Sequence, residues 1–106
     1  MILSFQNDTI KESYENFDFC NKNYGTKIAH RIIQRLGELQ AAENMMEFIT
    51  AIPAIKIEEV KNETLFLYTV NLIDNTKLLI KLKQKLQPNL ANHDSILDIE
   101  IVDILN

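Results

Sequence analysis

The side chains whose spacing in this sequence suggests chemistry are cations. Lys27, Arg31 and Arg35 recur at intervals of four residues, which places them along one side of a helix as a cationic ridge. A second set shares the odd numbering, and therefore one face, of a predicted strand: Lys77, Lys81, Lys83 and Lys85. Cations arranged in this way bind phosphates or acidic partners. Both patterns are also explained by an ordinary solvent-exposed face. On a strand, charged side chains on such a face discourage edge-to-edge pairing.

Histidine and cysteine are too sparse to predict metal or thiol chemistry. His30 lies beside the ridge and His93 lies in a polar loop, so they are too far apart in sequence to suggest a metal pair. The single cysteine, Cys20, is expected to be a small buried apolar residue rather than a nucleophile. We therefore expect no metal site and no cofactor.

Length and composition predict one compact domain that spans residues 1–106. With 46% hydrophobic and 25% charged residues, the chain is typical of a globular protein. It has no apolar run long enough to cross a bilayer, no leader-like segment and only one cysteine, so we expect a cytoplasmic protein with no membrane partner. The net charge of −4 argues against avid RNA binding by the surface as a whole, but it allows a local basic patch.

The N-terminal part of the chain predicts a short strand followed by a helix. Residues 2–5 are apolar and suit a first or edge strand. The helix is expected to begin at Asp8 or Thr9, with Glu12 completing a capping box, and to end near Cys20.

A second helix is expected to begin at Thr26, which would be its cap. Apolar residues then recur with helical spacing at Ile28, Ala29, Ile32, Ile33, Leu36 and Leu39. Residues 44–50 predict a short helical turn in which Met45, Met46 and Phe48 fill the core, and Pro53 ends the helical region.

After Pro53 the apolar residues alternate, which predicts four strands at residues 56–60, 65–72, 76–82 and 96–105. Turns at residues 62–63 and 74–75 would join the first three strands into antiparallel pairs. Asp103 shares the odd parity of the apolar residues in the last strand, so its side chain is expected on the core side. The predicted order is β-α-α-β-β-β-β, an α+β fold with two N-terminal helices packed on a mainly antiparallel sheet.

Four segments of this chain together form a recognisable pattern. The helical segment contains Tyr24-Gly25, Ala29, Ile32, Arg35-Leu36, Glu38-Leu39 and Ala41-Ala42-Glu43-Asn44. The other segments are Ile52-Pro53, the strand pair around Asn71-Leu72 and Lys77-Leu78-Leu79-Ile80, and Ile99-Glu100-Ile101-Val102-Asp103. This pattern resembles the HigB-type toxins of the RelE/ParE superfamily over nearly the whole chain, and it implies the RelE/ParE-like fold.

The resemblance also implies a catalytic set made of Lys61, Lys77 and Asp103. The two lysines would contact phosphate, and Asp103 would assist proton transfer. The expected RNA- or partner-binding residues are Lys27, Arg31, Arg35, Lys56, Lys81 and Lys83.

The sequence departs from the family in three catalytic segments, so the implied site is degenerate. Residues 57–62 keep Glu58 and Lys61 but lack the histidine that is usual there. Lys77 stands where an arginine is usual, and it keeps the charge without the bidentate fork. The family's terminal Asp-Tyr-His is replaced by Asp103-Ile104-Leu105-Asn106.

The function implied by the resemblance is that of the toxin in a type II toxin–antitoxin system. Such a toxin is an mRNA interferase, an endoribonuclease that cuts mRNA on the ribosome. Its expected partners are a HigA-like helix-turn-helix antitoxin, the ribosome and mRNA, and operator DNA only through the antitoxin. Two alternatives remain open: a catalytically inactive homologue that acts as an antitoxin-binding module, and a ParE-like inhibitor of DNA gyrase.

Overall fold

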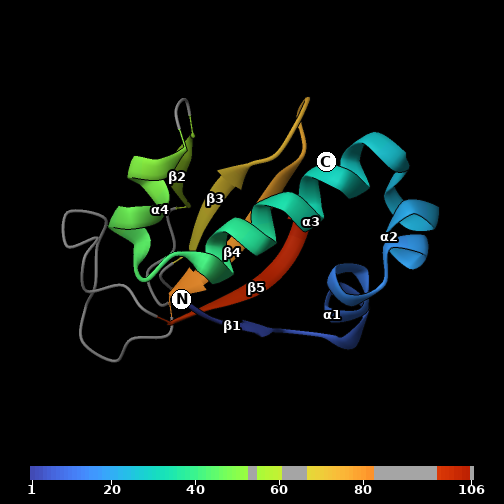
Figure 1. Ribbon diagram of the computed structural model, residues 1–106, viewed down its shortest axis with the longest axis horizontal. Coiled ribbons are helices and arrows are strands. Elements are labelled where there is room, and N and C mark those ends of the chain that lie inside the picture. Colours follow the sequence, from blue (N-terminus) through green and yellow to red (C-terminus); the bar gives the residue numbers. More distant parts are fainter. Residues whose placement is uncertain (53–54, 61–66, 83–97, 106) are drawn as a thin grey trace.

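The computed structural model describes residues 1–52, 55–60, 67–82 and 98–105, which form an α+β fold (Figure 1). Four helices lie in this part of the chain: α1 (Asp8–Glu15), α2 (Phe17–Tyr24), α3 (Thr26–Ala41) and α4 (Met45–Ala51). Five strands form one sheet: β1 (Ile2–Phe5), β2 (Ile57–Val60), β3 (Leu67–Asn71), β4 (Lys77–Leu82) and β5 (Asp98–Leu105). The expected α+β class is confirmed.

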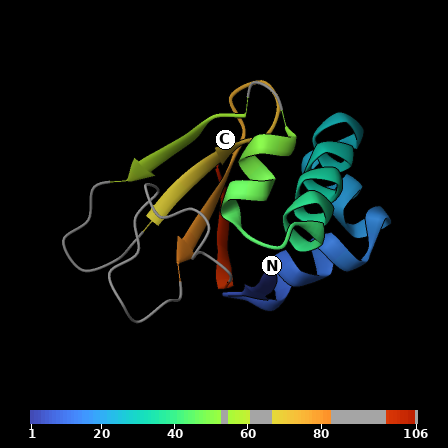
Figure 2. The ribbon, with the colours of Figure 1, turned by 60° about the vertical axis from the view of Figure 1, so that its left-hand side comes forward.

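The sheet is mixed, with the strand order β1-β5-β4-β3-β2. Strands β2 to β5 form an antiparallel meander, as expected, whereas β1 pairs with β5 in parallel orientation. A parallel pair needs a crossover connection, and the four helices lie in the long connection that follows β1. Figure 2 shows these helices on one side of the sheet, which leaves its outer face without a described helix.

The core lies between the helices and the inner face of the sheet. Helix α3 buries Ala29, Ile32, Leu36 and Leu39, in agreement with its predicted stripe. The strands bury Val70, Leu78, Ile80, Leu82, Ile99 and Ile101, in agreement with the predicted alternation. Met45 and Phe48 of α4 are also buried, but Met46 is 44% exposed, so the core prediction was wrong for Met46.

The predicted helix at residues 8–20 is divided into α1 and α2, and Asn16 lies between them in extended conformation. The Asn16 side chain accepts a hydrogen bond from the backbone N–H of Phe19 and so caps α2. The predicted cap at Thr26 was also wrong. Gly25, with a φ of 84°, precedes α3, while the Thr26 hydroxyl donates to the side-chain oxygen of Asn21.

The predicted N-cap of the first helix was displaced by one or two residues. Asn7 is the cap, because its side-chain oxygen accepts the backbone N–H of Ile10 at 3.0 Å. The Asn7→Ala substitution should therefore lower the free energy of unfolding by about 1 kcal/mol, the usual cost of a lost cap. Thr9→Ala, at the predicted cap, is the control and should have little effect in urea unfolding. Equal losses for the two variants would contradict this assignment.

A β-bulge in β5 reverses the predicted orientation of Asp103. Ile101 pairs with Ile80 of β4, but Asp103 pairs with the adjacent Leu79, so Val102 is an extra residue in β5. The inserted residue changes the alternation, so Ile104 is buried and Asp103 is exposed. The expectation that Asp103 faces the core was therefore wrong.

Candidate functional site

The outer face of the sheet holds the polar residues of its central strands. Lys77 and Lys81 both lie on this face of β4, as predicted, with the half-buried Leu79 between them. Lys77 is paired across the sheet with Asn71 of β3. Glu58 of β2 is paired with Thr69 of β3, so three strands bring polar side chains to one face.

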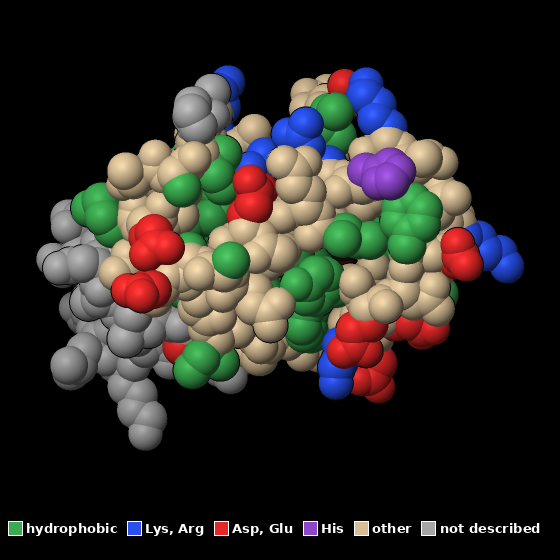
Figure 3. Space-filling model, viewed as in Figure 1, with side chains coloured by type: hydrophobic (Ala, Val, Ile, Leu, Met, Phe, Trp, Pro, Cys, Tyr) green, Lys and Arg blue, Asp and Glu red, His purple; other side chains and the backbone are tan. Residues whose placement is uncertain are grey.

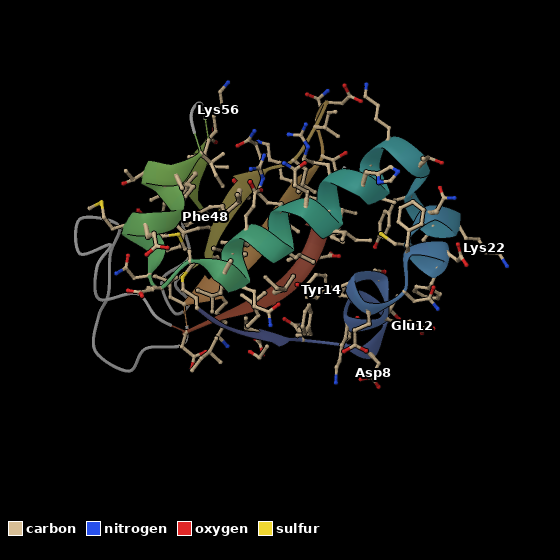
Figure 4. All side chains as sticks on the ribbon, viewed as in Figure 1. Asp8, Glu12, Tyr14, Lys22, Phe48 and Lys56 are labelled. Carbon is tan, nitrogen blue, oxygen red and sulfur yellow. The ribbon has the colours of Figure 1, made fainter. Side chains whose placement is uncertain are left out.

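A polar pocket of about 270 Å³ lies on this face, near the turn between β3 and β4. Its lining includes Lys56, Glu58, Thr69, Asn71, Asp74 and Lys77. Figure 4 labels Lys56, which extends from the chain beside β2. The pocket thus contains two of the expected site residues, Lys56 and Lys77. It also contains the carboxylate of Glu58, which was not expected in the catalytic set.

Two backbone features position the pocket. Lys56 is held against β3 because Asn71 N–H donates to Lys56 C=O at 3.0 Å and Lys56 N–H donates to Asn71 Oδ1 at 2.6 Å. The turn between β3 and β4 is closed by the backbone bond from Leu72 N–H to Thr76 C=O at 2.9 Å. Asp74 at its tip has a φ of 55°, a left-handed conformation that aspartate tolerates better than most residues.

The electrostatic balance of the pocket favours an anionic ligand. Lys56 and Lys77 oppose Glu58 and Asp74, but Asp74 is paired with Lys27 of α3, with 3.5 Å between Nζ and Oδ2. This exposed ion pair is weak, but it places a third cation beside the same turn. The arrangement can hold a phosphate near the ammonium groups while Glu58 accepts a proton.

Lys81 and Asp103, two other predicted site residues, do not line this pocket. Lys81 is paired with Glu100 of β5, with 3.9 Å between Nζ and Oε1.

Asp103 Oδ1 accepts the backbone N–H of Ile104 at 2.8 Å. Burial raises the pKa of Tyr24 in α2, a hydrogen bond with Ser13 lowers it, and the nearby Asp103 charge also raises it. The predicted site residues Lys61 and Lys83 lie outside the described residues, as does His93.

The predicted cationic ridge on α3 is only partly present, because Arg35 is buried. The Arg35 side chain retains 4% exposure, and its Nη1 donates to Glu38 Oε1 at 3.1 Å. Burial lowers the pKa of the Arg35 guanidinium, Glu38 opposes this change, and Arg31 adds to it. The buried Nε has no hydrogen-bond partner among the described residues. The prediction that Arg35 belongs to an exposed ridge was therefore wrong, whereas Lys27 is exposed and Arg31 is half-buried.

Charge is segregated on the face of the molecule seen in Figure 3. Lysine and arginine side chains gather along the upper edge, over α3 and the start of β2. Aspartate and glutamate side chains gather mainly along the lower edge, over α1, and near α4. In a chain with a net charge of −4, this face therefore has a basic upper edge, where Lys56 of the polar pocket also lies.

Of the histidines and the cysteine, the structure describes His30 and Cys20, and Cys20 is buried as expected. His30 is exposed and its ring lies 4.7 Å from that of Phe17. Cys20 is fully buried, and burial raises the pKa of its thiol, which disfavours the reactive thiolate. Within the described ranges, no group of histidine, cysteine and carboxylate side chains could hold a metal ion. No helix in this part of the chain combines the length and apolarity needed to cross a bilayer.

No family model, curated protein or solved structure matches the chain. The candidate site therefore depends on its own residues and geometry. Sequence reasoning missed Glu58, Thr69 and Asn71 as members of one pocket. Their alternation in β2 and β3 is visible in the sequence, but their pairing across strands becomes known only from the register.

Proposed function

We propose that this protein is a HigB-like toxin of the RelE/ParE superfamily, with the fold of that superfamily, and that it cleaves RNA at the outer face of its sheet. The observation that carries the proposal is the pocket that joins Lys56, Glu58 and Lys77. The order of a β-strand, helices and a four-stranded meander supports it. The basic upper edge seen in Figure 3, where Lys56 of this pocket lies, also supports it, because phosphate binding depends on local positive charge.

The proposed reaction is an internal transesterification of the RNA backbone. Glu58 accepts the proton of a ribose 2′-hydroxyl, and the 2′-oxygen forms a bond to the adjacent phosphorus while the bond to the 5′-oxygen breaks. Lys56 and Lys77 stabilise the negative charge that develops on the phosphorane oxygens. The proton then passes to the departing 5′-oxygen, so the products are a 2′,3′-cyclic phosphate and a 5′-hydroxyl.

The cellular setting belongs to the same proposal. The protein acts in the cytoplasm on mRNA bound to the ribosome, and a HigA-like helix-turn-helix antitoxin neutralises it. Operator DNA is reached only through that antitoxin. The single buried cysteine is compatible with a reducing compartment.

Lys77 provides the first test because Lys81 is a matched control. Both lysines lie on the same face of β4, but Lys77 lines the pocket while Lys81 is paired with Glu100. Induced expression of the wild type should arrest growth and produce discrete cuts in mRNA. Lys77→Ala should reduce the cleavage rate by about 100-fold, the lower end of the cost of losing one oxyanion donor, because Lys56 remains. Lys81→Ala should cleave almost normally.

The same experiment separates the other candidate functions. Growth arrest with intact mRNA and with gyrase-dependent DNA damage would replace this proposal with gyrase inhibition. The absence of arrest and cleavage, from protein shown to be folded by circular dichroism, would leave an antitoxin-binding module. Equal losses of cleavage in both lysine variants would place the reaction outside the pocket.

A further inference from the structure

Strand β1 forms one edge of the sheet and pairs only with β5 within the described residues. The backbone N–H of Gln6 donates to Ile101 C=O at 2.9 Å. Because the backbone groups of successive residues in a strand point to opposite sides, this bond fixes the directions of the N–H and C=O groups of the residues before Gln6. Ser4 therefore directs its N–H and C=O toward β5, whereas those of Leu3 and Phe5 point away from the sheet. Figure 1 shows β1 along the lower border of the molecule, with no described strand beyond it.

This edge strand is short, with four residues, but it lacks several other features that usually prevent strand pairing. β1 has the sequence Ile2-Leu3-Ser4-Phe5, without a charged residue or proline, and its pairing with β5 has no bulge. Ile2 is 66% exposed, more than any other large hydrophobic residue in the described part of the chain. An unprotected edge of this kind is suited to pairing with another extended segment.

A cavity of about 480 Å³ lies beside the same edge, between β1 and α1. Phe5 and Tyr14 form its aromatic wall, with 6.1 Å between their ring centroids, and Tyr14 Oη donates to Gln40 Oε1 at 2.7 Å. Asp8 and Glu15 also line the cavity, together with Lys11. Figure 4 shows Tyr14 on the side of α1 toward β1, and Asp8 and Glu12 on the outer part of this helix.

We propose that the edge of β1 that no described strand covers, together with this cavity, binds an extended basic segment of a partner protein as an added strand. The Leu3 and Phe5 backbone groups supply the ladder bonds, and the cavity takes a lysine or arginine side chain whose aliphatic stem lies on Tyr14. The charge of α1 selects the basic partner, because Asp8, Glu12 and Glu15 outweigh Lys11. This site is separate from the pocket on the outer face and does not depend on RNA cleavage.

The same charges argue against a second copy of the chain as the occupant. Pairing of two β1 edges would bring two acidic α1 helices toward each other. Pairing of β1 with the opposite edge of the sheet would place α1 near Glu58 and Glu59 of β2. Like charges placed close together destabilise either arrangement, whereas a basic segment is stabilised by the same carboxylates.

The test is a titration of the full chain with synthetic peptides, followed by NMR. The probe is a peptide of about six residues that alternates valine with lysine, which matches the length of a typical strand. Hydrogen exchange at the Leu3 and Phe5 amides should slow by about tenfold or more at saturation. A peptide with glutamate in place of lysine should not bind, nor should the basic peptide N-methylated at the amides that face β1.

Matched variants test the contribution of the cavity. Glu15→Lys should weaken binding of the basic peptide by about fivefold, whereas Glu47→Lys in α4, which changes the net charge equally, should not. Three results would overturn the proposal: unchanged exchange at Leu3 and Phe5, equal binding of the N-methylated peptide, or concentration-dependent dimerisation that protects these amides in the free protein. RNA cleavage is measured separately, so failure of one proposal leaves the other intact.

Discussion

Glu58→Gln is expected to reduce RNA cleavage by about 100- to 10,000-fold, the range that one general base contributes. Glutamine keeps the size and polarity of the side chain but does not accept a proton from the 2′-hydroxyl. Glu58 is exposed in the edge strand β2, so its replacement should hardly change stability. Single-turnover cleavage of a model RNA on programmed ribosomes would measure the effect. The cleavage products should carry the same 2′,3′-cyclic phosphate ends in both proteins.

Glu59 provides the control for this substitution. It is adjacent to Glu58 in β2 and is also exposed, but it pairs with the buried Tyr68 and therefore lies on the opposite side of the strand. Glu59→Gln has the same change of charge and should keep nearly full cleavage. If both variants retain wild-type rates, Glu58 is not the base. If both lose activity equally, the effect comes from the charge of β2 rather than from the pocket.

Removal of Glu38 is expected to destabilise the protein more than removal of its partner Arg35. The Glu38→Ala substitution leaves a buried guanidinium without its carboxylate, and such broken pairs cost about 3 kcal/mol. Arg35→Met instead removes the buried charge together with an Nε that has no hydrogen-bond partner among the described residues. An apolar side chain of similar length should leave stability within about 1 kcal/mol of the wild type or increase it.

Urea unfolding of both variants and of Glu43→Ala measures this asymmetry. Glu43 is exposed between α3 and α4, so its removal should change the free energy of unfolding by less than about 0.5 kcal/mol. Arg35→Met in the Glu38→Ala background should recover most of the lost stability, because no unpaired charge remains. A larger loss for Arg35→Met than for Glu38→Ala would mean that the arginine stem makes the more important contribution.

The charge asymmetry of the molecule qualifies the conclusion drawn from its net charge. The formal charge of −4 predicts weak RNA binding when it is treated as a uniform property. On the face in Figure 3, however, acidic residues gather mainly over α1 and near α4, whereas Lys56 and Lys77 lie in the pocket with Glu58 and Asp74. Repulsion of RNA by the acidic side is reduced by distance and salt, so binding at the basic side is compatible with an acidic chain.

Local periodicity was enough to predict most of the secondary structure. The apolar stripe of α3 and the alternation of β4 repeat over several turns or residue pairs, so one error does not change the assignment. The helix caps were less predictable, because Asn7, Asp8 and Thr9 are all residues that favour a cap. The bond from Gln6 to Ile101 ends the β1 pairing immediately before Asn7, and this tertiary contact selects Asn7.

The orientation of two predicted site residues depended on long-range packing. Asp103 is exposed because the register of β4 and β5 contains a bulge, which the alternation within β5 alone does not reveal. Helical spacing places Arg35 in line with Lys27 and Arg31. The burial of Arg35 depends instead on the segments that pack against α3. Its partner Glu38 lines a groove between α3 and α4.

The sequence by itself determined the α+β class, the apolar faces and the cations available for binding, because each depends on residues close together in the chain. Only the tertiary structure decided which charged groups meet. Lys56 and Glu58 are separated from Lys77 by about 20 residues, and the antiparallel register of β2, β3 and β4 brings them into one pocket. Strand register is set by packing across the whole sheet, so this pocket does not follow from any local pattern.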